Sequence, residues 1–155
     1  MRTKAILTGA AVALALAAAG AALAADMAGV IQARQTHYKA IGAASKGIYD
    51  ELNKPAPQAT VIQGYAHQLN TLAPQIPTWF PVGSGPEAGV KTQAKAEIWS
   101  QPAAFKTAAD GFAAAAHHFD ATAAAGDIGA IRAEYPTLTK ACGNCHTQFR
   151  SKAPG

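Results

Sequence analysis

Two cysteines and a histidine near the end of the 155-residue chain have a spacing that is tied to one chemistry. Cys142, Cys145 and His146 form the run Cys-Gly-Asn-Cys-His, and Cys-x-x-Cys-His is the attachment signature of a c-type haem. Cysteines three positions apart lie on one face of a helix, about a turn apart, so both thiols can reach the vinyl groups on one porphyrin edge. The histidine that follows is turned toward the ring centre. The pattern predicts one covalent haem c, with His146 as ligand of the iron.

Three other chemistries use such a cysteine pair. A structural disulfide is the simplest in an exported protein, but spacing of three residues on a helix is poor for it. A redox dithiol of the thioredoxin type expects a strand–helix context near the start of a domain, whereas this pair ends a helical chain. A zinc site would need a fourth ligand. These alternatives stay open beside haem c.

The first 25 residues have the composition of a secretory signal peptide. Arg2 and Lys4 precede an uncharged run of Ala, Leu and Val, whose small-residue tail permits cleavage after Ala24 or Ala25. A retained membrane anchor is the alternative, because the run is about 20 residues long, but alanine is only weakly apolar. We therefore predict a cleaved signal peptide over residues 1–25.

The mature domain is predicted to span residues 26–155, to lie in the periplasm and to have no membrane span after cleavage. Export supports haem c, because bacteria attach this cofactor on the far side of the cytoplasmic membrane. Cleavage removes two cations and lowers the net charge from +4 to +2. The remaining Lys and Arg are scattered, which gives a nucleic-acid role little support.

The composition is short of bulky apolar side chains. Ala accounts for 40 of the 155 residues, and only 21 residues after position 25 are Leu, Ile, Val or Phe. The low net charge argues against disorder. Either the elements pack closely through Ala, or something other than side chains fills the middle, and a haem would supply that volume. Length, glycine content and the two cysteines exclude a large multidomain enzyme, a collagen-like fibre and a disulfide-dense mini-protein.

Four segments show the three-and-four spacing of amphipathic helices. The first runs from about residue 27 to 52 and the second from about 58 to 72. The third carries three phenylalanines seven residues apart, and Gly126 and Asp127 end it and cap the fourth. No pattern predicts a strand, so we expect an all-α fold, an antiparallel up-down four-helix bundle enclosing the haem. The apolar face of the first helix comprises Met27, Ile31, Arg34, Tyr38, Ile41, Ser45, Ile48 and Leu52.

Local signals refine this plan. Residues 73–96 are rich in Pro and Gly, which predicts a long loop before the third helix. Ser100 is the predicted N-cap of that helix, with Pro102 in its first turn. Pro136 lies inside the fourth segment and should kink it or split it in two.

Over nearly the whole mature chain, the sequence resembles the cytochrome c′ family, the class II cytochromes c. The signal peptide, the four helices and a haem motif near the C-terminus carry the resemblance, since class I cytochromes have that motif near the N-terminus. Pro136 and the lengthened loop at 82–96 depart from the usual pattern. Further motifs like those of the family are Arg34-Gln35, Trp79-Phe80-Pro81, Glu97-Ile98-Trp99-Ser100 and Phe149-Arg150.

The resemblance places Tyr38 on the side of the iron opposite His146. Low-spin relatives similar to cytochrome c-556 carry Met at this position. Met27 is eleven residues away, roughly 16 Å along a helix, so the usual sixth ligand is missing. Tyr38 is then a steric wall that leaves the iron five-coordinate, a phenolate ligand of the kind found in catalase, or a core aromatic with a satisfied hydroxyl.

Two arginines are further candidates for haem contacts. A buried charge at Arg34 would be costly unless paired, and the resemblance favours a salt bridge to a haem propionate; an arginine that snorkels at the bundle edge is the alternative. Arg150 lies one helical turn after His146. By resemblance it covers the proximal side of the haem, and a solvated C-terminal arginine is the alternative.

The other aromatic and histidine side chains are interpreted as structural. His37 points roughly 100° away from Tyr38 on a helix, so ligation would need a change of register. We interpret the remaining histidines as solvated or bundle-edge residues and the tryptophans and Phe80 as core and loop anchors. These residues are His67, His117, His118, Trp79, Phe80 and Trp99.

Two functions remain from different classes. One is an electron carrier that cycles between Fe(III) and Fe(II) with periplasmic redox partners. The other is a gas-binding protein that takes NO or CO at an open iron, which the absent methionine favours. The alternative to a protein with an open iron is a six-coordinate, low-spin electron-transfer cytochrome of the c-556 type, which has no gas-binding role. No acid–base or nucleophile constellation indicates an enzyme, although a peroxidase side activity stays open. A homodimer is suggested by the resemblance, and small residues at positions 40, 42, 43, 44 and 47 would allow its close packing.

Overall fold

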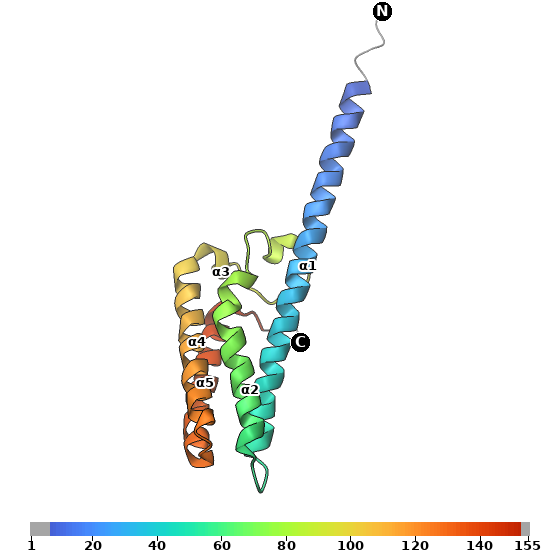
Figure 1. Cartoon of the computed structure of the whole chain (residues 1–155). Helices are drawn as coiled ribbons and strands as arrows, with labels where there is room; N and C mark the ends of the chain where they lie inside the picture. Colours follow the sequence, from blue (N-terminus) through green and yellow to red (C-terminus); the bar gives the residue numbers. More distant parts are fainter. Residues whose placement is uncertain (1–6, 153–155) are drawn as a thin grey trace, which may run out of the picture.

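The structure, a computed structural model, describes residues 7–152, with side chains from residue 26 onward. Four long helices form a bundle: α1 (Leu7–Leu52), α2 (Ala59–Leu72), α4 (Pro102–Ala124) and α5 (Ile128–Phe149). They run alternately down and up (Figure 1). Between α2 and α4 the chain forms η1 (Ala73–Trp79), η2 (Pro86–Ala88) and α3 (Glu97–Ser100). Residues 7–152 contain no strand, only an isolated antiparallel bridge between Ala94 and Arg150. The predicted all-α four-helix bundle is confirmed.

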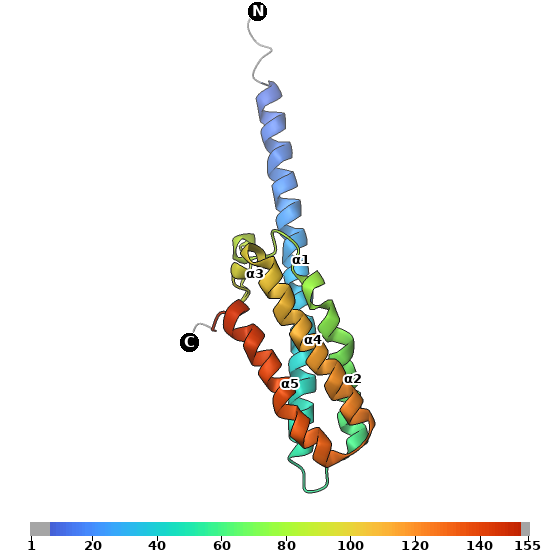
Figure 2. The same ribbon diagram turned by 90° about the vertical axis from the view of Figure 1, so that its left-hand side faces the viewer.

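The N-terminal part of α1 projects beyond the other helices as a single rod (Figure 2). The basic residues at positions 2 and 4 lie outside the described part of the chain, and cleavage of the signal peptide stays a prediction. Where side chains are described, no helix combines the length and hydropathy that a membrane crossing requires.

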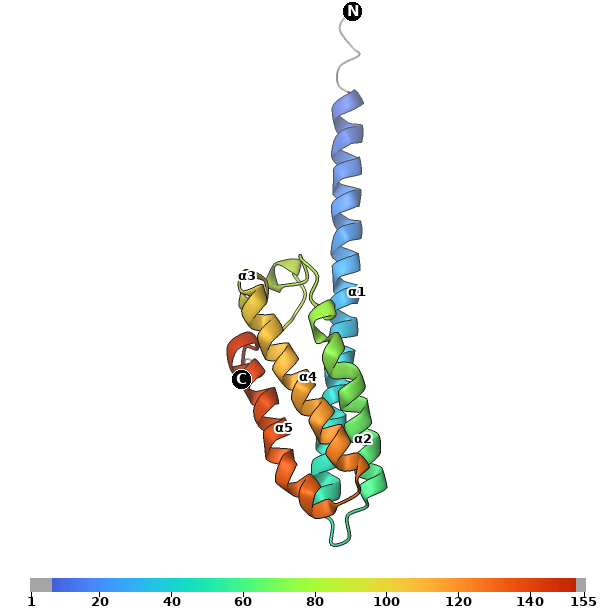
Figure 3. The same cartoon turned by 60° about the vertical axis from the view of Figure 1, so that its left-hand side comes forward.

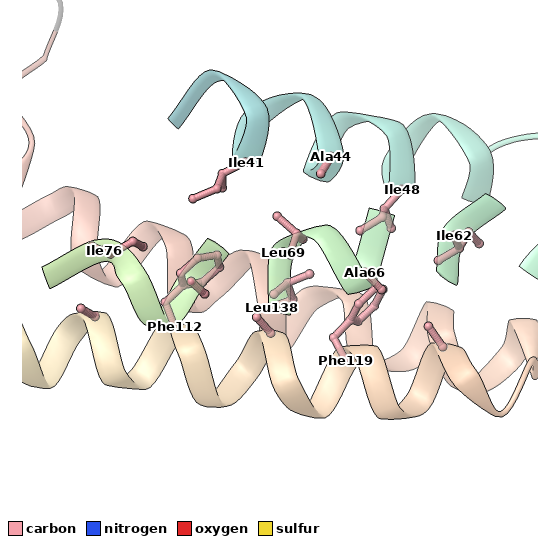
Figure 4. Close-up of a cluster of buried hydrophobic side chains, with 14 of the residues drawn as sticks. Ile41, Ala44, Ile48, Ile62, Ala66, Leu69, Ile76, Phe112, Phe119 and Leu138 are labelled. Carbon is pink, nitrogen blue, oxygen red and sulfur yellow. The ribbon is translucent and has the colours of Figure 1, made fainter. Parts of the chain in front are cut away.

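Neighbouring helices pack in the order α1–α2, α2–α4 and α4–α5 (Figure 3). The three phenylalanines that share one stripe of α4 are buried, and Figure 4 shows Phe112 and Phe119 among side chains from the other helices. Small residues let the helices pack closely, which is one of the two explanations that the composition allowed. At Gly47 of α1, an added Cβ would lie 2.5 Å from the ring of Tyr65 in α2. Six of the buried apolar residues are alanines: Ala44, Ala66, Ala73, Ala109, Ala116 and Ala123.

The start of α4 differs from the prediction. Ser100 is not its N-cap, because it is the last residue of the short helix α3, and the cap position belongs to Gln101, whose side chain makes no capping bond. The indole Nε1 of Trp99 donates to the carbonyls of Phe80 and Pro81 at 3.2 and 3.0 Å, so contacts distant in sequence hold this extra turn. Pro102 occupies the first turn of α4, as predicted.

Of the two effects predicted for Pro136, a split of the fourth helix is wrong, because α5 is continuous from Ile128 to Phe149, whereas a kink stays a prediction. Pro136 removes only one backbone donor, and it lies on the exposed side of the helix, where water can satisfy the freed carbonyl. The predicted cap is confirmed: Asp127 Oδ1 accepts from the backbone N–H of Gly129 at 2.7 Å and of Ala130 at 3.3 Å. Gly126 has a φ of 79°, a conformation that favours glycine at a helix end.

Candidate haem-binding site

The two cysteines lie on one face of α5, where both pack partly buried against the hydrophobic core. Both are free thiols, so the disulfide alternative is not what the structure contains. Burial raises the pKa of Cys142 to about 11 and also raises the pKa of Cys145. Both sulfurs are therefore protonated at neutral pH. Among the described residues, no cluster of three or more His, Cys, Asp or Glu could hold a metal ion, which leaves the zinc alternative without a ligand set.

His146 lies in the last turn of α5, and its side chain is exposed. Partial desolvation of the ring lowers the pKa of His146, and the positive charge of Arg150 lowers it further. The imidazole is therefore neutral near neutral pH, which is the form that binds a metal. Together with the free thiols of Cys145, directly before it, and of Cys142, about one turn before it, this donor set fits a c-type haem.

Tyr38 belongs to α1, and its ring stands edge-on to Trp79, at 5.5 Å between centroids, and to Phe80, at 6.2 Å. Burial raises the pKa of Tyr38 far above that of a free phenol, and negative charge on Cys145, once its thiol ionises at high pH, raises it further. Arg34 and Arg150 act in the opposite direction. Without a bound metal, the folded chain thus keeps the phenol protonated. Phenolate ligation of an iron stays an alternative.

Side chains of α1 and α5 border the same hydrophobic core, because Tyr38 and Cys145 both pack against it. Tyr38 and Arg34 come from α1, whereas Cys145 and Arg150 come from the C-terminal end of α5. α1 and α5 are not among the helix pairs whose backbones pack closely. They meet instead through side chains, such as the Tyr135 hydroxyl, which donates to the Ser45 carbonyl at 3.2 Å.

Arg34 is buried, with only 3% of its surface exposed, so the alternative of a snorkelling edge residue is wrong. Its guanidinium lies 4.4 Å from the centre of the Phe80 ring. Nη1 donates to the Ser84 hydroxyl at 3.1 Å and to the Trp79 carbonyl at 3.5 Å. Nη2 donates to the Ser84 carbonyl at 3.0 Å and to the Thr92 hydroxyl at 3.1 Å. Arg34 therefore anchors the connection between α2 and α4, and its contact with a haem propionate stays a prediction.

Ser84 and Thr92 are hydrogen-bond partners of Arg34 that sequence reasoning missed. Ser84 is fully buried and both accepts from Arg34 and donates to the Pro81 carbonyl at 2.8 Å. A serine in a loop rich in Gly and Pro carries no signal that distinguishes this role from an exposed turn residue. Only the buried cation at Arg34, which required partners, indicated that such acceptors had to exist.

Arg150 is exposed, follows the last turn of α5, and lies beside His146 as the spacing predicted. Its Nε donates to the Gln93 side-chain oxygen at 2.9 Å, and its backbone N–H donates to the His146 carbonyl at 3.0 Å. The residue is thus fixed by named partners, although its role toward the haem stays a prediction.

The remaining histidines lie at the edges of the bundle, as interpreted from the sequence. His37 stacks on Trp79 with 4.7 Å between ring centroids. His67 Nδ1 lies 3.6 Å from Asp120 Oδ2, and His118 Nδ1 lies 3.2 Å from Glu134 Oε1. Phe80, Trp79 and Trp99 are core and loop anchors; the Phe80 ring contacts those of Trp99 and Phe105 at 5.9 and 5.0 Å.

Comparison with known proteins decides which family has this arrangement. The family model described as Cytochrome C′ matches residues 29–150, from α1 to the residue after α5. The chain belongs to the cytochrome c′ family. The resemblance read from the sequence motifs is therefore confirmed. Cytochrome c′ proteins carry covalently bound haem c with its iron, so the predicted cofactor is confirmed as well, and they are electron-carrier or gas-binding proteins.

Individual relatives support the same assignment. Cytochrome c′ of Rhodospirillum rubrum is 35% identical over 79% of this chain and 77% of its own length. A relative described as cytochrome c-556, from Rhodopseudomonas palustris, is 32% identical over 72% of this chain and 71% of its own length. The solved structure of cytochrome c′ from Rubrivivax gelatinosus has a TM-score of 0.71 at 32% identity and covers 79% of this chain and 94% of that chain. Another, a nitric oxide complex of a variant cytochrome c′ from Alcaligenes xylosoxidans, has a TM-score of 0.70 at 26% identity, with 79% and 94% covered.

Proposed function

We propose that this cytochrome c′ holds one haem c through Cys142 and Cys145, with His146 on the iron, and that the opposite side stays open for NO or CO. The observation that carries the proposal is that Tyr38 of α1 and the two cysteines of α5 pack against the same hydrophobic core, and that no methionine belongs to this core. The one methionine after residue 25, Met27, lies elsewhere: its sulfur is 3.8 Å from the position of a Cβ placed on Gly83. No thioether therefore competes for the sixth position.

Each protein group has a separate task in this proposal. The Cys142 and Cys145 thiols form the covalent attachment, and the neutral imidazole of His146 ligates the metal. Tyr38, with Trp79 and Phe80 packed around it, forms an aromatic wall that limits access. A haem bound here supplies reversible one-electron exchange and one open coordination position. The nitric oxide complex known for the relative from Alcaligenes xylosoxidans supports a gas-binding role.

A six-coordinate, low-spin electron carrier is the second candidate, and the likeness to cytochrome c-556 favours it. In that case a side chain of this protein would occupy the sixth position. The family resemblance makes Tyr38 the candidate for that position, and tyrosine is not the methionine that low-spin relatives carry there. The observed side chains therefore favour the open site, with electron carriage as a compatible second role.

The cellular location, the redox partners and the oligomeric state of the protein are part of the same proposal. Residues 26–155 would form a non-enzymatic cytochrome domain in the periplasm after removal of residues 1–25, and redox partners there would exchange electrons with it. A homodimer would use exposed small residues of α1, of which Gly42 and Ala43 are available. Ala44 and Gly47 are not, because Ala44 is buried in the core and Gly47 faces Tyr65.

Haem staining and gas titration test the proposal together. The exported wild-type protein should keep its haem stain after denaturing electrophoresis, whereas Cys142→Ser together with Cys145→Ser should abolish it. The reduced wild-type protein should bind CO and NO with a single saturable absorbance change. Loss of the stain in the wild type would refute the attachment, and a stained protein that binds neither gas would refute the open site and favour the c-556 type.

A further inference from the structure

A cationic cleft lies beside His146 at the C-terminal end of α5. It has a volume of about 450 Å³. Figure 2 shows this end of α5 on the outside of the bundle, next to the connection that precedes α4. Three of the side chains along the cleft are cations. Its lining comprises Lys95, His146, Thr147, Arg150, Ser151 and Lys152.

Backbone hydrogen bonds build this cleft from two distant segments. The N–H of Lys95 donates to the Phe149 carbonyl at 3.0 Å, and the N–H of Ser151 donates to the Gln93 carbonyl at 2.8 Å. This antiparallel pairing places Lys95 opposite the end of α5, where Arg150 and Lys152 follow. Because main-chain bonds hold both segments, the three charges converge at a fixed place.

The cations of the cleft have no carboxylate partners among the described residues. Lys95 Nζ donates to the Thr147 carbonyl at 3.2 Å, and Arg150 Nε donates to the Gln93 amide oxygen. In contrast, the three lysines that form ion pairs lie elsewhere, at Lys46, Lys54 and Lys106. The nearest acidic residue in sequence, Glu97, forms none of the ion pairs. Within residues 26–152, the cleft therefore gathers three cations without an ion-pair partner beside His146.

We infer that this cleft is the docking site for an acidic surface of an electron-transfer protein. The inference rests on the proposed function, because it uses the haem attached next to the cleft. Complementary charge between surfaces steers encounter and fixes orientation, and it acts most strongly at low ionic strength. A partner with clustered Asp and Glu would bind at His146, on the short route to the iron.

Equilibrium binding to an acidic redox protein tests this inference on the haem-loaded protein. The probe is a plant-type [2Fe–2S] ferredoxin, and mitochondrial cytochrome c serves as a basic counterpart. The test variant is Lys95→Gln with Lys152→Gln. The control, Lys46→Gln with Lys106→Gln, removes the same charge from exposed helix pairs, which contribute little to stability.

The test variant should bind ferredoxin about tenfold more weakly at low ionic strength, since each removed charge weakens the attraction severalfold. The control should change the affinity less than about twofold, and the difference should shrink as salt is added. Carbodiimide coupling, which joins carboxylates to amines, should link ferredoxin to Lys95 and Lys152. Mitochondrial cytochrome c should not bind the cleft.

Three results would overturn the docking surface: an equal loss of affinity in both variants, cross-links confined to other lysines, or no binding of ferredoxin. Displacement of ferredoxin by inorganic phosphate, beyond the effect of chloride at equal ionic strength, would also overturn it and would identify a site for small anions. A protein without covalent haem would instead refute the proposed function. A haem-loaded protein with no preference for ferredoxin would refute the docking surface alone.

Discussion

Arg34 holds Ser84 with two hydrogen bonds, from Nη1 to its hydroxyl at 3.1 Å and from Nη2 to its carbonyl at 3.0 Å, although 50 residues separate the two in sequence. Both residues are buried, so neither can exchange these bonds for water. The contact fixes the connection between α2 and α4 on α1. It therefore also fixes Trp79 and Phe80, which surround Tyr38.

Arg34→Ala should lower the free energy of unfolding by about 3 kcal/mol, because it leaves buried acceptors without donors. Urea unfolding measures the change, and Arg132→Ala, at an exposed arginine of α5, should cost less than about 0.5 kcal/mol. A double-mutant cycle with Ser84→Ala should show coupling of about 1 kcal/mol. Zero coupling would show that the effect of Arg34 on stability does not depend on its contacts with Ser84.

Gly47 and Gly42 on α1 offer a matched pair of substitutions with opposite expected signs. A Cβ at Gly47 would lie 2.5 Å from the Tyr65 ring, whereas nothing lies within 4 Å of one at Gly42. Gly47→Ala should therefore lower stability by about 1–3 kcal/mol, and Gly42→Ala should be neutral or raise it by up to about 1 kcal/mol. Thermal unfolding compares them, and equal melting temperatures would contradict the close approach of α1 and α2.

Tyr38 gives stability a defined dependence on pH. Burial raises the pKa of Tyr38 in the folded chain, so above about pH 10 the unfolded chain loses a proton that the folded chain retains. Stability is then fully present below pH 10 and falls by up to about 1.4 kcal/mol per pH unit above it. Tyr38→Phe should remove this component between pH 10 and 12 and leave the pH dependence below pH 9 unchanged. If the stability of the wild type and of Tyr38→Phe changed with pH in parallel, the phenol of Tyr38 would not be desolvated.

Tyr38 should also control access of gases to the iron. Tyr38→Ala removes the ring that Trp79 and Phe80 support, and it should raise the association rate of CO about tenfold, a change of about 1.4 kcal/mol in barrier. Tyr38→Phe keeps the ring and should bind CO at close to the wild-type rate. Flash photolysis measures both rates. An unchanged rate in Tyr38→Ala would show that another group forms the wall.

Features set by local sequence were predictable. The helices follow from apolar spacing, the cap at Asp127 from its residue type, and the attachment motif from the spacing of two cysteines and a histidine. The prediction for Ser100 was wrong because distant contacts decided the outcome: Trp99 holds the extra turn α3. Pro136 does not split α5, because its exposed position lets the helix continue through the proline.

The composition of the site depended on contacts that sequence patterns do not encode. Tyr38 entered as a candidate through family resemblance, and Arg34 also through its place on the apolar face of the first helix. The structure packs Tyr38 and Cys145 against the same core. That Arg34 binds Ser84 could not be predicted, because the pairing depends on how a long connection folds back over α1. The cationic cleft could not be predicted from the sequence either, because the bridge between Ala94 and Arg150 creates it.

The spectrum of the reduced protein tests the central claim most directly. Resonance Raman and absorption spectra of the haem-loaded wild type should show a five-coordinate, high-spin iron that changes coordination when CO is added. This result would place His146 alone on the iron and leave the Tyr38 side open. A six-coordinate, low-spin spectrum in both oxidation states, unchanged by CO, would contradict the account.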